Sequence, residues 1–309
     1  MTRKRKSHIN TILITGGTGQ IGRELRNFLP NARYIASTDC NLTCCLATHE
    51  MIKEIRPNVV IHTAARVGGI VDNIKHQTEY YSDNVLINTN LINSCLKHDV
   101  SKFIGVLSTC IYPDTVNIYP MNEDVMHNGS PTKTNFSYGI AKRGMGVHID
   151  SIRNQYGKSY CYTIPCNLYG IHDKYNDRSH FVAALLKKIH LARINGETKI
   201  MLYGTGAPLR QVLYAKDLAN ILASMVKNDL YENFNIASPD NLTIHDIARV
   251  ALDSLGLNHF EIEYDNTMPD GQYRKDVCIN KFKSYFPNFQ FTSLSDGIKE
   301  VYAAVFRNI

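Results

Sequence analysis

Short apolar runs recur along the first half of the chain, and longer stretches with helical periodicity separate them. The apolar runs at residues 11–15, 32–37, 58–62, 102–108 and 160–165 predict strands. Residues 20–28, 49–55 and 80–97 place apolar side chains at helical spacing and predict helices between them. Strands that alternate with helices indicate an α/β fold with a parallel, doubly wound sheet of the Rossmann type.

The pattern becomes less regular after residue 170. A helix is predicted at residues 180–194, a strand at 199–203 and another helix at 215–227, followed by a loop-rich tail. We therefore expect a dinucleotide-binding domain at residues 1–170 and a smaller C-terminal substrate-binding lobe at 171–211 and 238–309. Residues 212–237 are expected to return to the first domain.

Composition and charge narrow the classes of protein that this chain can represent. Of its 309 residues, 44% are hydrophobic, which is enough for an ordinary core. No apolar run approaches the roughly 20 residues that cross a bilayer, and no apolar signal segment follows the basic start, so we expect a cytoplasmic protein without a membrane partner. Arg3, Lys4, Arg5 and Lys6 supply four charges of the net +6, and we interpret them as a solvated terminus. Nothing in the sequence indicates a nucleic-acid partner.

The eight cysteines show no metal or disulfide pattern. Cys44 and Cys45 are adjacent, which is not the C-x-x-C spacing of zinc and redox sites. Without a secretory signal, disulfides are not expected, and no metal is predicted. Cys110 differs from the others because it lies next to the candidate chemistry described below.

A glycine-rich turn, Gly16-Gly-Thr-Gly-Gln-Ile-Gly22, follows the first predicted strand directly. In such turns one glycine permits the tight bend, here assigned to Gly17, while Gly19 lets the backbone approach a pyrophosphate and Gly22 lets the helix pack on the strand. The amides of Gln20 and Ile21 then face the anion at the start of the helix. With Gly16, the spacing is G-x-x-G-x-x-G, which is typical of short-chain dehydrogenases/reductases.

The end of the second predicted strand bears on which nicotinamide cofactor binds. Ser37 and Thr38 can hydrogen-bond a 2′-phosphate, whereas Asp39 lies slightly past the strand and can face the adenine. We therefore predict NADP(H) rather than NAD(H), with Ser37 and Asp39 among the cofactor contacts.

Tyr138 and Lys142 stand four residues apart, which places both on one face of a helix. An ammonium beside a phenol favours the tyrosinate, so we expect Lys142 to lower the pKa of Tyr138 from about 10. Such a tyrosine can donate a proton to a carbonyl oxygen as hydride arrives at its carbon. Ser108 ends the predicted strand 102–108, where ligands of parallel sheets bind, and its hydroxyl can hold the same oxygen.

Seven segments, in this order, resemble the GDP-L-fucose synthase family, the GDP-4-keto-6-deoxy-mannose 3,5-epimerase/4-reductases of the extended short-chain dehydrogenase/reductase superfamily. They are Ala64-Ala-Arg-Val-Gly-Gly-Ile70, Ser108-Thr-Cys-Ile-Tyr-Pro113, Tyr138-x-x-x-Lys142, Pro165-Cys-Asn-Leu-Tyr-Gly170, Ser179-His180, Tyr203-Gly-Thr-Gly-x-Pro-Leu-Arg210 and Pro269-Asp-Gly-x-x-Arg-Lys275. The second segment and the Val-Gly-Gly-Ile of the first are quite specific to that family.

The resemblance implies a role for each matching residue. Ser108, Tyr138 and Lys142 match the reductase triad, Cys110 the thiol that removes ring protons and His180 the acid that returns them. The implied cofactor contacts also include Ala64, Ala65, Asn167, Leu168, Lys142 and His180. The implied substrate contacts are Lys188, Tyr203, Arg210, Arg274 and Lys275.

The chemistry of a 4-keto sugar is consistent with these implied roles. A ketone at C4 acidifies the protons on C3 and C5, because the resulting carbanion is an enolate that Ser108 and Tyr138 can stabilise. A thiol titrates near pH 8.5 and can act as base on one ring face, with an imidazole as acid on the other. The implied substrate is a GDP-linked 4-keto-6-deoxy sugar, and NADPH then reduces C4.

The chain also departs from the family pattern. Thr18 replaces a basic residue of the glycine loop, and no arginine stands near Ser37, which weakens the NADP(H) prediction. Lys187-Lys188 replaces arginines, and lysine lacks their bidentate grip on phosphate. Tyr203 replaces a tryptophan. A longer sugar, such as a GDP-4-keto-6-deoxy-heptose, and a protein that only reduces C4 are therefore alternatives.

Other functions of this fold remain as competitors. A nucleotide-sugar 4,6-dehydratase needs an Asp-Glu pair after Thr109, where this chain has Cys110-Ile111. A UDP-galactose-type 4-epimerase or a dTDP-4-keto-rhamnose-type reductase leaves the thiol unexplained, and non-catalytic dinucleotide sensors commonly lose the tyrosine or lysine. Members of this fold class often pair through two long helices, here residues 80–97 and 136–155, so we expect a homodimer.

Overall fold

The computed structural model describes residues 11–176, 179–268 and 270–306. The basic tail from Arg3 to Lys6 and Pro269 of the Pro-Asp-Gly segment lie outside the described residues.

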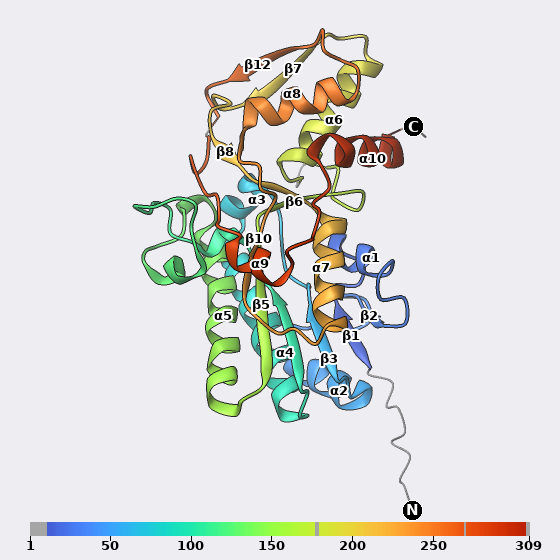
Figure 1. The fold of residues 1–309 in the computed structure, drawn as a ribbon, viewed down its shortest axis with the longest axis vertical. Coiled ribbons are helices and arrows are strands. Elements are labelled where there is room, and N and C mark those ends of the chain that lie inside the picture. Colours follow the sequence, from blue (N-terminus) through green and yellow to red (C-terminus); the bar gives the residue numbers. More distant parts are fainter. Residues whose placement is uncertain (1–10, 177–178, 269, 307–309) are drawn as a thin grey trace, which may run out of the picture.

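A six-stranded sheet forms the larger part of the molecule (Figure 1). Its strands are β1 (Ile12–Thr15), β2 (Arg33–Ile35), β3 (Val59–His62), β4 (Lys102–Val106), β5 (Ser159–Pro165) and β10 (Phe234–Ile236). They lie in the order β10-β5-β4-β3-β1-β2, and each neighbouring pair is parallel. The chain reverses its direction of winding next to β1, which creates a crevice at the carboxyl ends of β1 and β3. The predicted Rossmann-type α/β fold is confirmed.

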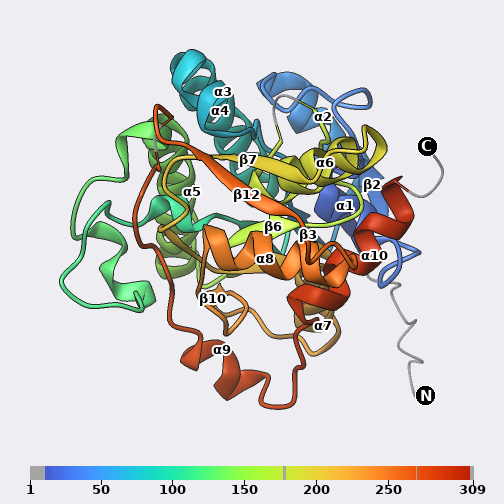
Figure 2. The same cartoon turned by 90° about the horizontal axis from the view of Figure 1, so that it is seen from above.

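Helices cover both sides of this sheet because its strands are apolar on both faces. The helices α2 (Cys45–Ile55), α4 (Gln77–Lys97) and α5 (Phe136–Tyr156) pack against one another, and α1 (Gln20–Leu25) packs against α7 (Ala215–Lys227). Figure 2 shows these two groups on opposite sides of the sheet. The first helix is shorter than predicted, because Asn27 and Phe28 bond to carbonyls three residues back and tighten its last turn.

The second part of the molecule combines short strand pairs with helices. Its strands are β6 (Asn167–Tyr169) beside β9 (Val212–Tyr214), β7 (Lys199–Tyr203) beside β12 (Glu261–Asp265), and β8 (Leu209–Arg210) beside β11 (Leu242–Thr243). The helices α6 (Phe181–Ile194), α8 (Ile244–Ser254) and α10 (Leu294–Phe306) enclose a separate hydrophobic core. This lobe lies above the carboxyl ends of the main strands (Figure 1).

The packing differs in two places from the expected domain boundaries. Strand β9 pairs with β6 and contributes to the core of the lobe, although α7 and β10 after it belong to the main sheet layer. Residues 277–291, with α9 (Asn280–Tyr285), pack into the sheet core because Phe282 contacts Phe234. Sequence periodicity does not report which core a short aromatic segment joins.

The remaining elements are α3 (Ile70–Lys75) and the 3₁₀ turns η1 (Thr109–Ile111), η2 (Glu123–His127) and η3 (Lys133–Asn135). None of the helices in the described part of the chain is long and apolar enough to cross a membrane. All eight cysteines are free thiols.

Candidate active site

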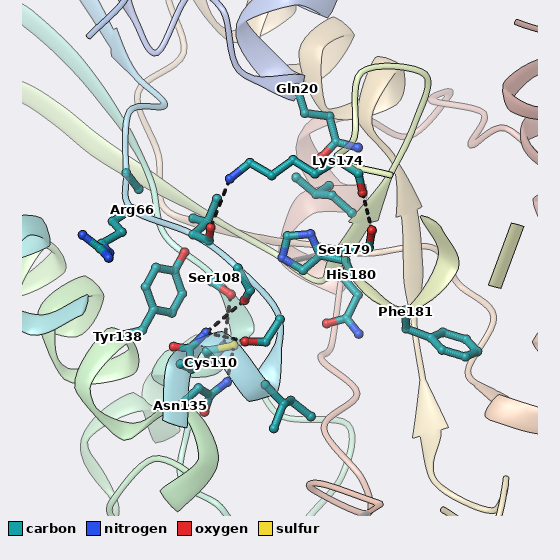
Figure 3. Close-up of a pocket in the computed structure, with 18 of the residues that line it drawn as sticks. Gln20, Arg66, Ser108, Cys110, Asn135, Tyr138, Lys174, Ser179, His180 and Phe181 are labelled. Carbon is teal, nitrogen blue, oxygen red and sulfur yellow. Dashed lines mark hydrogen bonds between the residues drawn. The ribbon is translucent and has the colours of Figure 1, made fainter. Parts of the chain in front are cut away.

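A cavity of about 1260 Å³ opens where the carboxyl ends of β1, β3 and β4 face the lobe. Its walls come from both parts of the molecule. On the sheet side, lining residues are drawn from the segments 16–21, 35–43, 63–71, 106–110 and 132–142, and on the other side they are drawn from residues between 165 and 275. Crevices of this kind are the usual ligand sites of open parallel sheets. Figure 3 shows Ser108, Cys110, Asn135 and Tyr138 gathered at one wall, with His180 facing them.

The glycine turn forms one end of the cavity. Gly16 adopts φ +75°, and a Cβ atom there would lie 2.7 Å from Thr63 Oγ1. A Cβ at Gly22 would lie 2.2 Å from the Gly16 carbonyl oxygen, so glycine is required for the helix to pack on the turn. The assignment of the tight bend to Gly17 is wrong. The left-handed residue is Gly16, and Gly17 is restricted instead by the Tyr34 Cβ atom, which lies 2.8 Å from a Cβ added there.

The end of β2 places only one of its two predicted contacts in the cavity. Ser37 is exposed and lines the cavity, as do Cys40 and Asn41 beyond it. Asp39 does not line it, because its carboxylate accepts a hydrogen bond of 2.8 Å from the Ala36 amide and closes the turn after the strand. The geometry therefore does not support Asp39 as a cofactor contact.

Lys142 and Tyr138 lie in α5 and line the same cavity. Lys142 is only 2% exposed, and its Nζ donates to the Val106 carbonyl at 2.8 Å. Burial lowers the pKa of the Lys142 ammonium from 10.5 to about 7. Burial, with Cys110 and Tyr80 nearby, raises the pKa of the Tyr138 phenol well above 10. The expectation that Lys142 lowers the phenol pKa is wrong, because burial favours the neutral form of both groups.

A buried polar chain lies beneath this pair. His62, fully buried on β3, hydrogen-bonds Thr15 Oγ1 at 2.7 Å and Asn88 Oδ1 at 3.0 Å. Asn88 in turn donates to the Ala141 carbonyl at 3.4 Å, which ties α4 to α5, the helix that carries Tyr138 and Lys142. Burial, together with Lys142, lowers the pKa of His62 to about 3. His62 is thus a neutral structural histidine, and it connects the sheet to α5.

The thiol of Cys110 reaches the cavity from η1, directly after β4. Ser108 caps this turn by accepting from the Cys110 amide at 3.3 Å, and Asn135 Nδ2 donates to Cys110 Sγ at 2.9 Å. Cys110, Ser108 and Tyr138 therefore face a common space, as the predicted chemistry requires.

His180 lies at the N-cap of α6 and borders the cavity from the lobe. Its Nδ1 is 3.6 Å from Asp173 Oδ1, and the Asp173 carboxylate is only 4% exposed. The second oxygen of Asp173 is buried without a hydrogen-bond partner among the described residues. At this distance the carboxylate attracts the imidazole ring when the ring is protonated, although the contact is longer than a hydrogen bond.

The predicted cofactor contacts Ala64, Ala65, Asn167 and Leu168 all line the cavity, as do Gly16, Gly19, Gln20 and Ile21. Of the predicted substrate contacts, Lys188, Tyr203, Arg210 and Lys275 line it too. Lys188 Nζ lies 4.2 Å from the centroid of the Tyr203 ring. Arg274 does not line the cavity, because its guanidinium pairs with Asp276 at 2.6 and 3.0 Å, so the geometry does not support it as a substrate contact.

Four residues at this site were not predicted from the sequence. Arg66 and Lys174 line the cavity, with Arg66 paired to Asp83 at 2.9 Å and Lys174 bonded to the Val67 carbonyl at 3.4 Å. Asn135 and Asp173 act on the two residues proposed for epimerisation. Arg66 falls within a recognised segment and could have been found there. The partnerships of Asn135 and Asp173 leave no signal in sequence spacing.

Comparisons with known proteins give this site a family. A family model described as the NAD dependent epimerase/dehydratase family matches residues 12–237. A GDP-L-fucose synthase of Dictyostelium discoideum is 34% identical over 303 residues, which cover 94% of this chain and 93% of that protein. A probable GDP-L-fucose synthase of Drosophila melanogaster is 32% identical over 307 residues, with 93% and 94% covered.

Solved structures agree. A GDP-L-fucose synthetase from Naegleria fowleri bound to NADP matches with a TM-score of 0.84 and 30% identity, covering 97% of this chain and 93% of the other. The resemblance inferred from the sequence motifs is confirmed. This chain belongs to the NAD dependent epimerase/dehydratase family and, within it, to the GDP-L-fucose synthase family.

Proposed function

We propose that this protein is an NADP(H)-dependent epimerase/reductase of a GDP-linked 4-keto-6-deoxy sugar. It inverts C3 and C5 with Cys110 and His180 and then reduces C4 with Tyr138 as proton donor. One observation carries the proposal. The thiol, the phenol and the imidazole line a single cavity at the carboxyl ends of the strands, next to a glycine turn that fits a dinucleotide.

The turn and its surroundings fit NADP(H). The turn closes so tightly that a Cβ at Gly22 would strike the Gly16 carbonyl, and the buried Gln20 Nε2 has no hydrogen-bond partner among the described residues. Gly19, Gln20 and Ile21 would hold the pyrophosphate, Ser37 the 2′-phosphate, and Asn167 with Leu168 the nicotinamide. The cofactor supplies the hydride that reduces C4. NADP in the Naegleria fowleri structure supports this choice.

The residues of the chain account for the proton transfers. Ser108 holds the C4 oxygen, and Cys110 takes a proton from the adjacent ring carbon while that oxygen carries the enolate charge. His180 returns a proton from the opposite side of the cavity, so the stereocentre inverts. In the reduction, Tyr138 gives its proton to the C4 oxygen. A phenol whose pKa burial has raised stays protonated at neutral pH, which is the form that this step needs.

The substrate's nucleotide would lie toward the lobe. Lys188, Arg210 and Lys275 provide positive charge along that wall, and Tyr203 offers a ring surface beside Lys188. Burial lowers the pKa of Arg210 and of Lys275, so an anionic ligand that pairs with them would bind more tightly than at an exposed site. The relatives named GDP-L-fucose synthase support a GDP sugar.

A two-part assay tests the proposal. The protein is incubated with GDP-4-keto-6-deoxy-mannose and NADPH in deuterated water, with NADPH absorbance reporting reduction and mass spectrometry reporting label at C3 and C5. We expect consumption of NADPH and label at both carbons. Reduction without label would make the protein a C4 reductase, and the same assay with a 4-keto-6-deoxy-heptose would then test the longer substrate. Binding of NADPH without either reaction would favour the sensor alternative and contradict the proposal.

Tyr138→Phe provides the decisive variant. It should lower the rate of reduction by about 10²- to 10⁴-fold, the usual contribution of a positioned proton donor, and leave NADPH binding intact. Tyr156→Phe is the matched control, because Tyr156 ends the same helix, is 52% exposed and does not line the cavity. Equal rates in the two variants would remove Tyr138 from the mechanism.

We also propose a homodimer that pairs through α4 and α5. Tyr81, Leu86 and Val147 are exposed apolar side chains on these helices, and a second, small hollow lies between the helices there. An exposed apolar helix pair of this kind suits a second copy of the chain.

A further inference from the structure

The side-chain amide of Asn135 has an unusual hydrogen-bond partner, the sulfur of Cys110. Asn135 occupies the N-cap of α5, where asparagine normally accepts a hydrogen bond from a backbone amide of the first turn. Here its side chain makes no such bond. Instead, Nδ2 donates to the sulfur of Cys110 at 2.9 Å, and Oδ1 is buried without a partner among the described residues. The helix therefore lacks a stabilising side-chain cap at Asn135, and the Asn135 amide bonds the thiol instead.

The backbone of Cys110 is tied to the same turn of α5. A Cβ at Gly139 would lie 2.5 Å from the Cys110 carbonyl oxygen, so α5 approaches η1 as closely as it does only because residue 139 is glycine. Gly139 directly follows Tyr138. The sulfur is therefore fixed relative to the phenol that serves the same sugar carbonyl, through its backbone on one side and the Asn135 amide on the other.

Two positively charged side chains also lie near the sulfur. Arg210 on β8 and Lys275 in the segment before α9 both interact electrostatically with Cys110, and a thiolate there favours the charged form of each. Tyr138 faces the sulfur from α5 as a neutral phenol, and Ser108 belongs to the same turn as the thiol. The hydrogen bond from an N–H donor is stronger when its acceptor is an anion, whereas a neutral thiol is a weak acceptor.

We propose that Asn135 is a positioning residue for epimerisation: its amide holds the Cys110 sulfur at the cavity wall and donates to that sulfur when the thiol acts as the base. This inference rests on the proposed function only for the identity of the substrate, because the coupling between Asn135 and the thiol can be measured without substrate. It assigns Asn135 no part in the hydride transfer to C4.

Asn135→Asp separates this role from a structural one. Aspartate has nearly the same shape and is as good an N-cap as asparagine, so a merely structural residue would tolerate it. It lacks the N–H donor and places a negative charge against the sulfur, so the proposal predicts a large loss. Asn135→Ala removes the donor without adding charge, which keeps the test informative if the aspartate variant folds poorly. Asn128→Ala, at an exposed position outside the cavity, is the control.

The first measurement is the pH dependence of Cys110 alkylation by iodoacetamide, followed on the Cys110 peptide by mass spectrometry. Because only thiolate reacts, the rate at neutral pH should fall about tenfold in Asn135→Ala and further in Asn135→Asp, with the midpoint moved to higher pH. Arg210 and Lys275 remain in every variant, so they do not contribute to the difference. An unchanged profile in both variants would overturn the proposal, even if the protein acts on no sugar.

The second measurement separates epimerisation from reduction. Deuterium incorporation into the 4-keto sugar should fall at least tenfold in both variants, whereas oxidation of the C4 hydroxyl of the finished GDP-6-deoxy sugar by NADP should stay within about twofold, since the reverse hydride step needs no thiol. Equal losses in both reactions would identify Asn135 as a general structural residue. Wild-type protein that shows no sugar chemistry at all would refute the proposed function, with the alkylation result still deciding the role of Asn135.

Discussion

Lys142 should destabilise the folded protein at neutral pH, and Lys142→Met should reveal by how much. The ammonium is 2% exposed, and burial lowers its pKa from 10.5 to about 7. Each pKa unit corresponds to about 1.4 kcal/mol, so keeping this lysine buried costs about 4 kcal/mol of folding free energy near pH 7. The Val106 carbonyl loses its bond from Nζ in the variant, which reduces the gain by about 1 kcal/mol. Methionine has a similar length and no charge, and the variant should be more stable by about 3 kcal/mol.

The sign of the pH dependence follows from proton counting. Between the folded pKa of about 7 and the unfolded 10.5, the unfolded chain binds a proton at Lys142 that the folded chain does not, so wild-type stability rises with pH. Below pH 7 both states are protonated and the penalty is constant. The advantage of Lys142→Met should therefore narrow by about 2 kcal/mol between about pH 7 and about pH 8.5.

Urea unfolding of both proteins across this pH range measures the effect. Buried thiols such as Cys95 and Cys161 also titrate differently in the unfolded chain, but they are common to both proteins and cancel in the difference. Lys227→Met, at an exposed position, should change neither stability nor its pH slope. If Lys142→Met is less stable than wild type, with a gap that does not vary with pH, then the surroundings stabilise the ammonium and our reasoning is wrong.

Three further predictions concern the turn, the imidazole and the dimer. Gly22→Ala places a Cβ 2.2 Å from the Gly16 carbonyl oxygen and should weaken NADPH binding at least tenfold in a fluorescence titration. The control Gly144→Ala, whose Cβ meets nothing within 4 Å, should bind NADPH like wild type. Equal binding by the two variants would show that close packing at residue 22 is not needed for the cofactor. Asp173→Asn removes the carboxylate 3.6 Å from His180 and should lower deuterium incorporation about tenfold without slowing the reverse C4 oxidation. An equal loss of deuterium incorporation and C4 oxidation would mean general damage to the protein. Val147→Arg on α5 should give a monomer by analytical ultracentrifugation where wild type and Ile194→Arg on α6 give a dimer; a monomeric wild type would refute the dimer.

Local patterns in the sequence were enough to predict the sheet and the cofactor turn. The apolar runs of β3 and β5 are buried on both faces, and such strands stand out against the helical stretches between them. The glycine turn is contiguous and short-range, so its spacing determines its conformation almost by itself. Only the choice between Gly16 and Gly17 as the left-handed residue required the structure.

The partners of charged side chains could not be read in the same way. Asp39 and Arg274 both lie in segments expected to contact ligands, yet each interacts with a residue close in sequence. Asp39 accepts a hydrogen bond from Ala36, three residues back, and Arg274 pairs with Asp276, two residues ahead. The ionisation of Tyr138 was misjudged for a related reason. The i, i+4 spacing places an ammonium nearby, but burial favours the neutral form of both groups. Spacing along a helix shows proximity, and desolvation is decided by the rest of the fold.

The residues proposed for the two reactions divide between the two parts of the molecule. The reductase group, Ser108 with Tyr138 and Lys142, belongs entirely to the sheet side, as does the thiol. The imidazole comes from the first residue before α6, in the lobe. The proposed epimerisation therefore requires the lobe to hold His180 at a fixed position across the cavity, whereas the proposed C4 proton transfer does not.

The segment between β6 and α6 provides that positioning. Asp173 lies beside His180, Lys174 next to it bonds the Val67 carbonyl of the opposite wall at 3.4 Å, and Tyr175 donates to the Gly170 carbonyl at 2.9 Å. The Lys174 bond links this segment to the sheet side of the cavity, and Tyr175 packs against the lobe's core and the ring of Phe306. Under the proposed mechanism, weakening the Lys174 bond should reduce label exchange before it affects reduction, so epimerisation should be the more fragile of the two proposed activities.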